Sequence, residues 1–292
     1  MTDDHPLPRS LRPEQPIGVF DSGLGGLTVV RAIREHCPEE DIVYLGDNAR
    51  VPYGTRSPET VKKYAVTCAR ELASRGVKAI VVACNTVSSV AIEVLRSELD
   101  LPVSGVIVPG ARAATKAAGE APIGVLATGG TISSGAYTRA VAALSSRTEV
   151  IGRPAPLLVS LAEEGWLSGE VPQLVVRRYV EPFFGPDRGM GLPRDAHVGC
   201  VVLGCTHFPL FHELIERELK NLGGRGIPVV DSAQQTAKDV RDFLQSRELS
   251  TPSEQGGSLK VLVTDMPKSF EDVATRFLGD AVGRVEQVDL KP

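Results

Sequence analysis

Two short stretches decide the fold of this 292-residue chain: Val-Val-Ala-Cys-Asn-Thr at 81–86 and Val-Leu-Gly-Cys-Thr-His at 202–207. Each is an apolar run that stops at a cysteine followed by two polar residues. Two further pairs of stretches resemble one another: Pro-Ile-Gly-Val-Phe-Asp-Ser-Gly (16–23) with Pro-Ile-Gly-Val-Leu-Ala-Thr-Gly (122–129), and Leu-Pro-Val (101–103) with Ile-Pro-Val (227–229). Because the three matches come in the same order in both halves, they indicate two α/β units of similar topology.

Short β-branched runs alternate with longer segments of helical period along the whole chain. The expected strands lie at 17–20, 42–45, 79–83, 106–108, 123–126, 198–203, 229–230 and 259–263. The expected helices lie at 27–35, 58–75, 87–99, 134–144, 174–184 and 210–222. This alternation predicts parallel sheets with helices on both faces. Ligands of such folds bind beyond the carboxyl ends of the strands, so functional residues should directly follow the apolar runs.

The composition is that of an ordinary globular protein, with 42% hydrophobic and 23% charged residues, and the length suggests about two domains. Thirty-two Lys and Arg against 36 Asp and Glu leave a net charge of −4, so there is no basic footprint for nucleic acid. No apolar run approaches the ~18 residues of a membrane helix. Residues 1–15 contain several prolines and no signal-peptide core, so we expect a disordered arm, a cytoplasmic location and five reduced cysteines.

Cys84 and Cys205 are the strongest candidates for a chemical role. A cysteine in an apolar run is more often a small buried hydrophobe. These two, however, lie past their runs and are followed by Asn-Thr and Thr-His, polar groups that a core does not accommodate. Each is expected to precede a helix, whose N-terminal dipole favours a thiolate. Cys37, Cys68 and Cys200 lack this setting and are expected to be structural, and no C-x-x-C pair or His-rich cluster indicates a metal site.

Two glycine-containing turns follow the first two expected strands. Asp-Ser-Gly-Leu-Gly-Gly at 21–26 matches neither G-x-G-x-x-G nor a P-loop, so a tight turn and a weak anion-binding nest both stay open. Asp21 is either a cap or a site residue. Val-Pro-Tyr-Gly-Thr at 51–55 is either a turn with its ring packed inward or a loop whose amides meet a ligand carboxylate. Spacing alone does not choose between these interpretations.

Three polar residues of the second half complete the candidates. His207 lies two residues from Cys205, where a histidine can polarise or protonate a thiolate, although a lone histidine is usually a bystander. Glu163 and Glu164 lie in a stretch of helical pattern, for which a solvated face is the default expectation.

The sequence resembles the bacterial glutamate racemases, cofactor-independent enzymes that supply D-glutamate for peptidoglycan, over about residues 17–233. The resemblance rests on five blocks in order: I-G-V-F-D-S-G-L-G-G-L-T-V, Y-L-G-D-N-A-R-V-P-Y-G-T, A-C-N-T, I-G-V-L-A-T-G-G-T-I-S-S-G-A-Y and L-G-C-T-H-F-P-L. Related aspartate and hydantoin racemases share the paired cysteines, but not usually D-S-G-x-G-G together with P-Y-G-T.

This resemblance implies a set of site residues. Cys84 and Cys205 would be the catalytic thiols, with Asp21 assisting the first and His207, supported by Glu163, assisting the second. The implied substrate contacts are Asp21, Ser22, Tyr53, Gly54, Asn85, Thr86, Thr206 and His207. The sequence departs from the family in three places. The segment before Glu163 differs, which leaves the choice between Glu163 and Glu164 open. Phe208 stands in place of a frequent tyrosine, and residues 185–195 are an insertion.

The resemblance also implies an architecture of two pseudo-symmetric, doubly wound α/β domains with the active site in the cleft between them. The first domain would comprise 16–111 with 227–292, and the second 112–226. The strands at 229–230 and 261–263 would both return to the first sheet. We expect a homodimer that acts on glutamate, with no cofactor, no metal, no nucleic-acid partner and no membrane association.

The chemistry explains why two cysteines are needed. A single base returns a proton to the face it came from, so inversion of an α-carbon requires acid–base groups on opposite faces. The other interpretations are a racemase of aspartate or hydantoin, a binding protein that kept the fold without turnover, and a thiol redox protein. The last is disfavoured because the two cysteines lie in different halves of the sequence.

Overall fold

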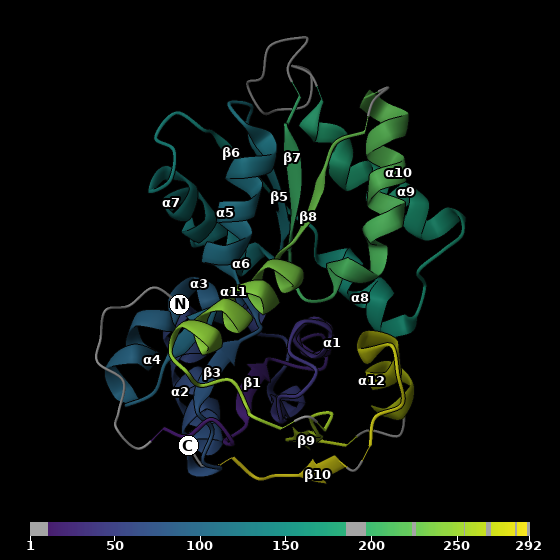
Figure 1. Ribbon diagram of the computed structural model, residues 1–292. Coiled ribbons are helices and arrows are strands. Elements are labelled where there is room, and N and C mark those ends of the chain that lie inside the picture. The colour runs from purple at the N-terminus through teal and green to yellow at the C-terminus, as the bar shows by residue number, and fades with distance from the viewer. Residues whose placement is uncertain are drawn as a thin grey trace. The chain divides into compact units, whose positions relative to one another are not determined.

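The computed structural model describes residues 11–184, 197–223, 226–253, 255–266, 270–283 and 285–290. Two compact units make up the chain, one of residues 1–106 with 233–292 and one of residues 107–232 (Figure 1). Most of the expected disordered arm, residues 1–10, and the expected insertion at 185–195 lie outside the described residues. In the described part of the chain, no helix is both long and apolar enough to cross a membrane.

The first unit contains a parallel sheet of six strands in the order β10-β9-β2-β1-β3-β4. Its strands are β1 (Ile17–Asp21), β2 (Ile42–Gly46), β3 (Ala79–Val82), β4 (Val103–Gly105), β9 (Leu259–Val263) and β10 (Val285–Gln287). Its helices are α1 (Leu27–His36), η1 (Asn48–Arg50), η2 (Tyr53–Thr55), α2 (Pro58–Ser74), α3 (Asn85–Val90), α4 (Ile92–Glu98), α11 (Ser232–Ser246), which begins at the unit boundary, and α12 (Phe270–Leu278).

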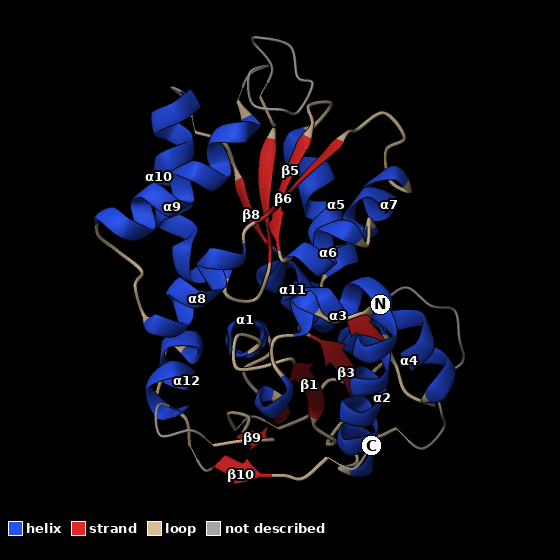
Figure 2. Cartoon of the chain, turned by 180° about the vertical axis from the view of Figure 1, so that it is seen from behind, coloured by secondary structure: helices blue, strands red, loops and turns tan. Residues whose placement is uncertain are grey.

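Helices cover both faces of this sheet, with α2, α3 and α4 on one face and α1 and α12 on the other (Figure 1, Figure 2). Strands β1, β2 and β3 are therefore buried along their whole length, as continuous apolar runs in a covered parallel sheet should be. Helix α2 begins where Ser57 accepts a hydrogen bond from the Thr60 amide and Pro58 fits the first turn. Its apolar face then packs on β1 and β2 in the core.

The second unit contains a parallel sheet of four strands in the order β6-β5-β7-β8. Its strands are β5 (Ile123–Ala127), β6 (Val150–Pro154), β7 (Cys200–Gly204) and β8 (Val229–Asp231). Its helices are α5 (Ile107–Ala118), α6 (Gly129–Ser133), α7 (Ala136–Ala142), α8 (Pro156–Glu164), α9 (Glu170–Val180), η3 (Glu181–Phe183), η5 (Phe208–Phe211) and α10 (His212–Gly223). Helices α5, α6 and α7 cover one face and α8, α9 and α10 the other (Figure 1, Figure 2).

The two sheets repeat one topology. The order β2-β1-β3-β4 in the first sheet corresponds to β6-β5-β7-β8 in the second. The sequence repeats coincide with this correspondence, because 16–23 and 122–129 contain β1 and β5, and 81–86 and 202–207 contain the ends of β3 and β7. The prediction of a mixed α/β fold with two similar units and parallel sheets is confirmed.

Several local predictions were wrong. The expected strand at 106–108 is the start of α5, and the strand of that region is β4 at Val103–Gly105. The expected return of 229–230 to the first sheet does not occur, since β8 pairs with β7 in the second sheet. Strands β6 and β10 were not predicted. The units meet in the chain at 106/107 and 232/233, whereas we expected boundaries near 111 and 227.

Candidate active site

Cys84 lies where β3 gives way to α3. It is the N-cap residue of that helix, and its carbonyl oxygen accepts the first helical hydrogen bond from the Ser88 amide at 2.8 Å. Its side chain is 6% exposed, and Sγ lies 3.4 Å from Ser22 Oγ, to which it donates a hydrogen bond. The next two residues, Asn85 and Thr86, are also buried in the first turn of α3. The structure thus places Cys84, Ser22, Asn85 and Thr86 at the carboxyl edge of the first sheet.

Asp21 ends β1 at the same edge of the sheet and is buried. Its Oδ2 accepts hydrogen bonds from the amides of Gly26 at 2.9 Å and Gly23 at 3.3 Å. These two amides of the glycine turn are therefore occupied by the protein's own carboxylate, which disfavours an anion nest there. A Cβ on Gly26 would lie 2.5 Å from Asp21 Cβ and 3.1 Å from Ala83 Cβ, so glycine permits the start of α1 to approach the ends of β1 and β3 closely.

Tyr44 of β2 lies beneath this turn and was missed by the sequence analysis. Its hydroxyl donates a hydrogen bond to Gly23 O at 2.7 Å. Burial first, and then the negative charge of Asp21, raises the pKa of Tyr44 well above its usual value. Asp21 ends β1 and Cys84 follows the neighbouring strand β3, so both lie at the same edge of the sheet. Tyr44 is the first residue of the Y-L-G-D-N-A-R-V-P-Y-G-T block, so its membership of that block was the sequence signal for a place near the site.

The Val-Pro-Tyr-Gly-Thr turn has its tyrosine ring packed inward. Tyr53 is 1% exposed and its hydroxyl donates a hydrogen bond to the buried carboxylate of Asp47. Burial, the main cause, together with the neighbouring negative groups, raises the pKa of Tyr53. The ring is thus committed to the core, which leaves the backbone of Tyr53 and Gly54 as the part of this turn that can face a ligand.

The second unit places Cys205 directly after β7, with Sγ 3.8 Å from His207 Nδ1. The same ring nitrogen lies 3.3 Å from Thr206 Oγ1. On the other side of the ring, His207 Nε2 lies 3.1 Å from Glu163 Oε1. No α-helix begins at Cys205, contrary to our expectation, because η5 starts at Phe208 and α10 only at His212. The polar partner of this thiol is therefore an imidazole rather than a helix N-terminus.

The pKa of His207 is raised to about 10. Burial alone would lower it, but the hydrogen bonds to Cys205 and Glu163, and the negative charge of both groups, outweigh burial. The ring is therefore an imidazolium at neutral pH, held between a sulfur and a carboxylate.

Glu163 reaches His207 from the last turn of α8, which ends at Gly165 in the left-handed conformation (φ 79°). A carboxylate at this end of a helix is disfavoured by the helix dipole. The nearby imidazolium provides the compensating positive charge. Glu163, rather than Glu164, makes this contact, and its side chain remains 54% exposed.

The other three cysteines are buried thiols of a different kind. Burial raises the pKa of Cys37 and of Cys200 to about 12, with charges around Cys37 as smaller causes. Burial, followed by the charge of Asp47, also raises the pKa of Cys68. Such thiols stay protonated and act as small core residues, as the sequence predicted.

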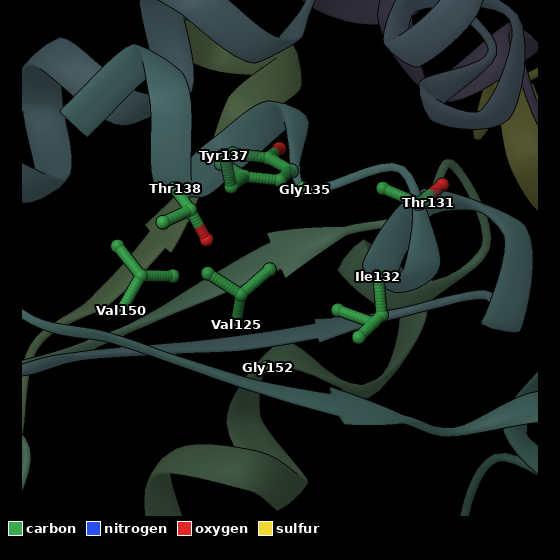
Figure 3. A pocket seen from close by; sticks show the side chains of 8 residues that line it. All are labelled: Val125, Thr131, Ile132, Gly135, Tyr137, Thr138, Val150 and Gly152. Carbon is green, nitrogen blue, oxygen red and sulfur yellow. The ribbon is translucent and has the colours of Figure 1, made fainter. Parts of the chain in front are cut away.

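A cavity of about 90 Å³ in the second unit contains none of the predicted site residues. Val125, Ile132, Thr138 and Val150 point into the space between β5, β6 and the α6–α7 segment (Figure 3). Its complete lining is Val125, Thr131, Ile132, Gly135, Tyr137, Thr138, Val150 and Gly152. No cationic side chain belongs to this lining, so the cavity is not built for a dicarboxylate. Among the described residues, no group of three or more His, Cys, Asp and Glu is placed to hold a metal ion.

Comparison with known proteins identifies the family to which this chain is similar. The Asp/Glu/Hydantoin racemase family model matches residues 17–240. A glutamate racemase of Geobacter metallireducens is 45% identical over 279 residues, covering 96% of this chain and 98% of its own. The glutamate racemase of Francisella tularensis, solved in complex with D-glutamate, superposes with a TM-score of 0.84 at 35% identity and covers 95% and 98% of the two chains. A Bacillus anthracis glutamate racemase isoform gives a TM-score of 0.86 at 34% identity, covering 96% and 99%.

Near-complete coverage at this identity extends the likeness beyond a shared fold. The match contains both cysteine-bearing strand ends, the glycine turn after β1 and the histidine after β7. The chain therefore belongs to the Asp/Glu/Hydantoin racemase family, within its glutamate racemases.

Proposed function

We propose that this enzyme interconverts L- and D-glutamate, with Cys84 and Cys205 as the acid–base pair and no cofactor. The glutamate racemases that match nearly the whole chain, and the D-glutamate bound in the Francisella tularensis structure, support glutamate as the substrate. The observation that carries the proposal is the equivalence of the two cysteines. Cys84 follows β3 and Cys205 follows β7, which are corresponding strands of two sheets with the same order.

The reaction in this scheme needs two proton transfers on opposite faces of one carbon. The thiolate of one cysteine takes the α-hydrogen as a proton, which forms its S–H bond and leaves the C–H electron pair on the substrate as an enolate-like carbanion. The thiol of the other cysteine gives its proton to the opposite face and becomes the thiolate. No net proton is gained or lost, and the two cysteines exchange roles when the reaction runs in reverse.

The surroundings of the two thiols suit these complementary roles. Cys84 donates a hydrogen bond to Ser22 Oγ and lies at the same strand-end edge as the Asp21 carboxylate, an arrangement that fits a protonated thiol. Cys205 lies beside His207, whose ring nitrogen faces the sulfur at 3.8 Å and whose raised pKa keeps the ring protonated. Asp21 and His207 would then assist proton movement on their own sides, with Glu163 holding the imidazolium.

The α-proton of an amino acid is much less acidic than a thiol, so the developing negative charge must be stabilised. We assign this role to polar groups at the strand ends, which would bind the substrate carboxylates like an oxyanion hole. They are Ser22, the backbone at Tyr53 and Gly54, Asn85, Thr86 and Thr206. Exclusion of water around them would strengthen each contact.

Hydrogen exchange in D₂O tests the two-base scheme, with circular dichroism to follow inversion. We expect Cys84→Ala and Cys205→Ala to lose inversion by at least 10³-fold, since each lacks one of two obligatory groups. Each variant should keep α-proton exchange with one enantiomer at most, and the two should keep opposite enantiomers. Cys200→Ala removes a buried thiol of raised pKa and is the matched control, which should racemise at the wild-type rate. Wild-type racemisation by Cys84→Ala, or exchange of the same enantiomer by both variants, would refute the scheme.

The same resemblance leads us to propose three further properties: D-glutamate supply for peptidoglycan, a cytoplasmic location and a homodimer. The five free cysteines fit a reducing compartment. Analytical ultracentrifugation tests the dimer, and D-glutamate auxotrophy after gene deletion tests the pathway.

A further inference from the structure

We infer that Thr264, at the end of β9, is a positioning residue for the Tyr53–Gly54 turn and acts through the buried carboxylate of Asp47. Thr264 lies beyond residue 240, where the match to the family model ends. This inference rests on the proposed role of that turn in substrate binding.

Asp47 is the centre of a hydrogen-bond network. Its side chain is fully buried, and Arg50 Nε lies 2.7 Å from Oδ2. The hydroxyl of Tyr53 donates to the same oxygen, and Cys68 Sγ makes a weak contact with it at 3.9 Å. Oδ1 accepts a hydrogen bond from Thr264 Oγ1 at 3.0 Å. Both carboxylate oxygens are thus occupied: Oδ2 by groups from the turn and α2, and Oδ1 by Thr264 at the end of β9.

Thr264 and its neighbour hold the beginning of the turn at several points. Thr264 N donates to Gly46 O at 3.1 Å, and Thr264 Oγ1 accepts from the Ala49 amide at 2.9 Å. Asn48 and Asp265 bond reciprocally, Asn48 Nδ2 to Asp265 O and Asp265 N to Asn48 Oδ1. The backbone of η1 is therefore tied to the C-terminal end of β9 before it reaches Tyr53.

The opposite side of the turn is held by α2. The Tyr53 ring lies 5.3 Å from the Tyr64 ring, and the Arg50 guanidinium lies over Tyr64 at 4.5 Å. The ring contact packs Tyr53 against α2, and the cation–π contact ties Arg50 to the same helix. The Tyr53 hydroxyl bonds to one oxygen of Asp47, and Thr264 holds the other oxygen of that carboxylate.

Loss of the Thr264 hydroxyl would remove the hydrogen-bond donor that holds Oδ1 in a buried site. A buried carboxylate oxygen without its donor is costly, so we expect the Asp47 carboxylate to rotate or shift. Arg50 and Tyr53 both bond to Oδ2, so the turn would move with it. The substrate would then bind to a displaced backbone at Gly54, while the two cysteines stay in place.

The test is steady-state racemisation of both glutamate enantiomers by Thr264→Val, which keeps the β-branched shape without the hydroxyl. We expect KM to rise roughly three- to tenfold with kcat within about twofold of wild type, the pattern of weakened ground-state binding. Thr264→Ser restores the hydroxyl and should restore KM. The matched control is Thr67→Val, whose hydroxyl bonds only along α2 to Lys63 O at 3.0 Å and whose loss should leave KM unchanged.

A second variant tests the same path without altering β9. Tyr53→Phe removes the other hydroxyl that donates to Asp47, so it should raise KM as Thr264→Val does. If both act through Asp47, the double variant should raise KM by less than the product of the two single effects. If Thr264 had only a structural role, Thr264→Val would lower the melting temperature and the active fraction of the enzyme. The measured kcat would then fall, and KM would not rise separately from it.

Gly54→Val separates the failure of this inference from the failure of the proposed turn. A raised KM in Gly54→Val with an unchanged KM in Thr264→Val would overturn the role of Thr264 alone. An unchanged KM in both would overturn the role of the turn in binding, and the inference with it. Multiplicative effects of Thr264→Val and Tyr53→Phe, or no rescue by Thr264→Ser, would overturn the path through Asp47.

Discussion

Glu163→Gln should weaken proton binding by His207 by about fivefold. The perturbation removes the charge of a carboxylate whose Oε1 lies 3.1 Å from Nε2 and keeps an oxygen that can still accept a hydrogen bond. Two unit charges at that separation attract by ~1.3 kcal/mol in a water-like dielectric. Because the Glu163 side chain is 54% exposed, screening reduces the loss to ~1 kcal/mol, which is about fivefold in the proton-binding constant.

The pH dependence follows from the sign of this change. A pKa raised to about 10 means that the His207 imidazolium stabilises the fold fully below its unfolded value near 6.5, and that this stabilisation is lost as pH rises through about 10. In Glu163→Gln the folded pKa is lower, so the loss should be complete at lower pH, and the alkaline limb of kcat/KM should move to lower pH as well.

The assay is an NMR titration of the His207 ring nitrogens together with pH profiles of kcat/KM. Glu164→Gln removes the neighbouring exposed carboxylate, which does not contact His207, and is the control for net charge. Coinciding titrations of Glu163→Gln and wild type would refute the electrostatic coupling. An equal change in Glu164→Gln would refute its assignment to Glu163.

Two predictions concern the scaffold of the first unit. Gly26→Ala should lower the free energy of unfolding in urea by about 1–3 kcal/mol, because its Cβ would lie 2.5 Å from Asp21 Cβ. The control is Gly129→Ala, whose Cβ would have nothing within 4 Å and whose stability should stay within about 0.5 kcal/mol of wild type. Equal stabilities of the two variants would contradict this. Lys78→Met should lower the free energy of unfolding by about 3–5 kcal/mol, because it leaves the buried Glu40 carboxylate without the ammonium group that pairs with it. The double variant Lys78→Met with Glu40→Gln should recover part of that loss. A double variant less stable than Lys78→Met would argue against the pairing.

The internal repeat was the most informative part of the sequence. Three short matches in the same order predicted two similar units, and the two sheets have the same order of four corresponding strands. The prediction succeeded because apolar runs of parallel strands are buried on both faces and so remain visible as continuous β-branched stretches. Strands β6 and β10 escaped because neither is buried along its length, and their sequences lack such a run.

Two errors arose where the repeat was not followed far enough. Leu-Pro-Val at 101–103 and Ile-Pro-Val at 227–229 lead into β4 and β8, which occupy corresponding edges of the two sheets. Following that match would have placed β8 in the second sheet and β4 before residue 106. The run at 106–108 was read as a strand because Val-Ile-Val favours β structure, but it enters α5, whose Pro109 fits a first helical turn.

The sequence located the candidate residues at strand ends, but it did not predict their hydrogen-bond partners. The positions of Cys84 and Cys205 after apolar runs pointed to strand ends, since polar groups there follow from topology. The contacts of Glu163 with His207, of Asp21 with the glycine turn and of Asp47 with Thr264 depend on distances between elements far apart in sequence. Asp47 was overlooked because its partner on β9 lies 217 residues away.

Strand β9 does more than hold Asp47. It pairs with all five residues of β2, from Ile42 to Gly46, on the side opposite β1. A polypeptide ending at residue 240, the limit of the family-model match, would expose that row of backbone amides and carbonyls on an apolar strand. Unpaired edges of this kind recruit strands from other molecules. By pairing with β2, β9 covers an edge that would otherwise favour uncontrolled strand-to-strand association.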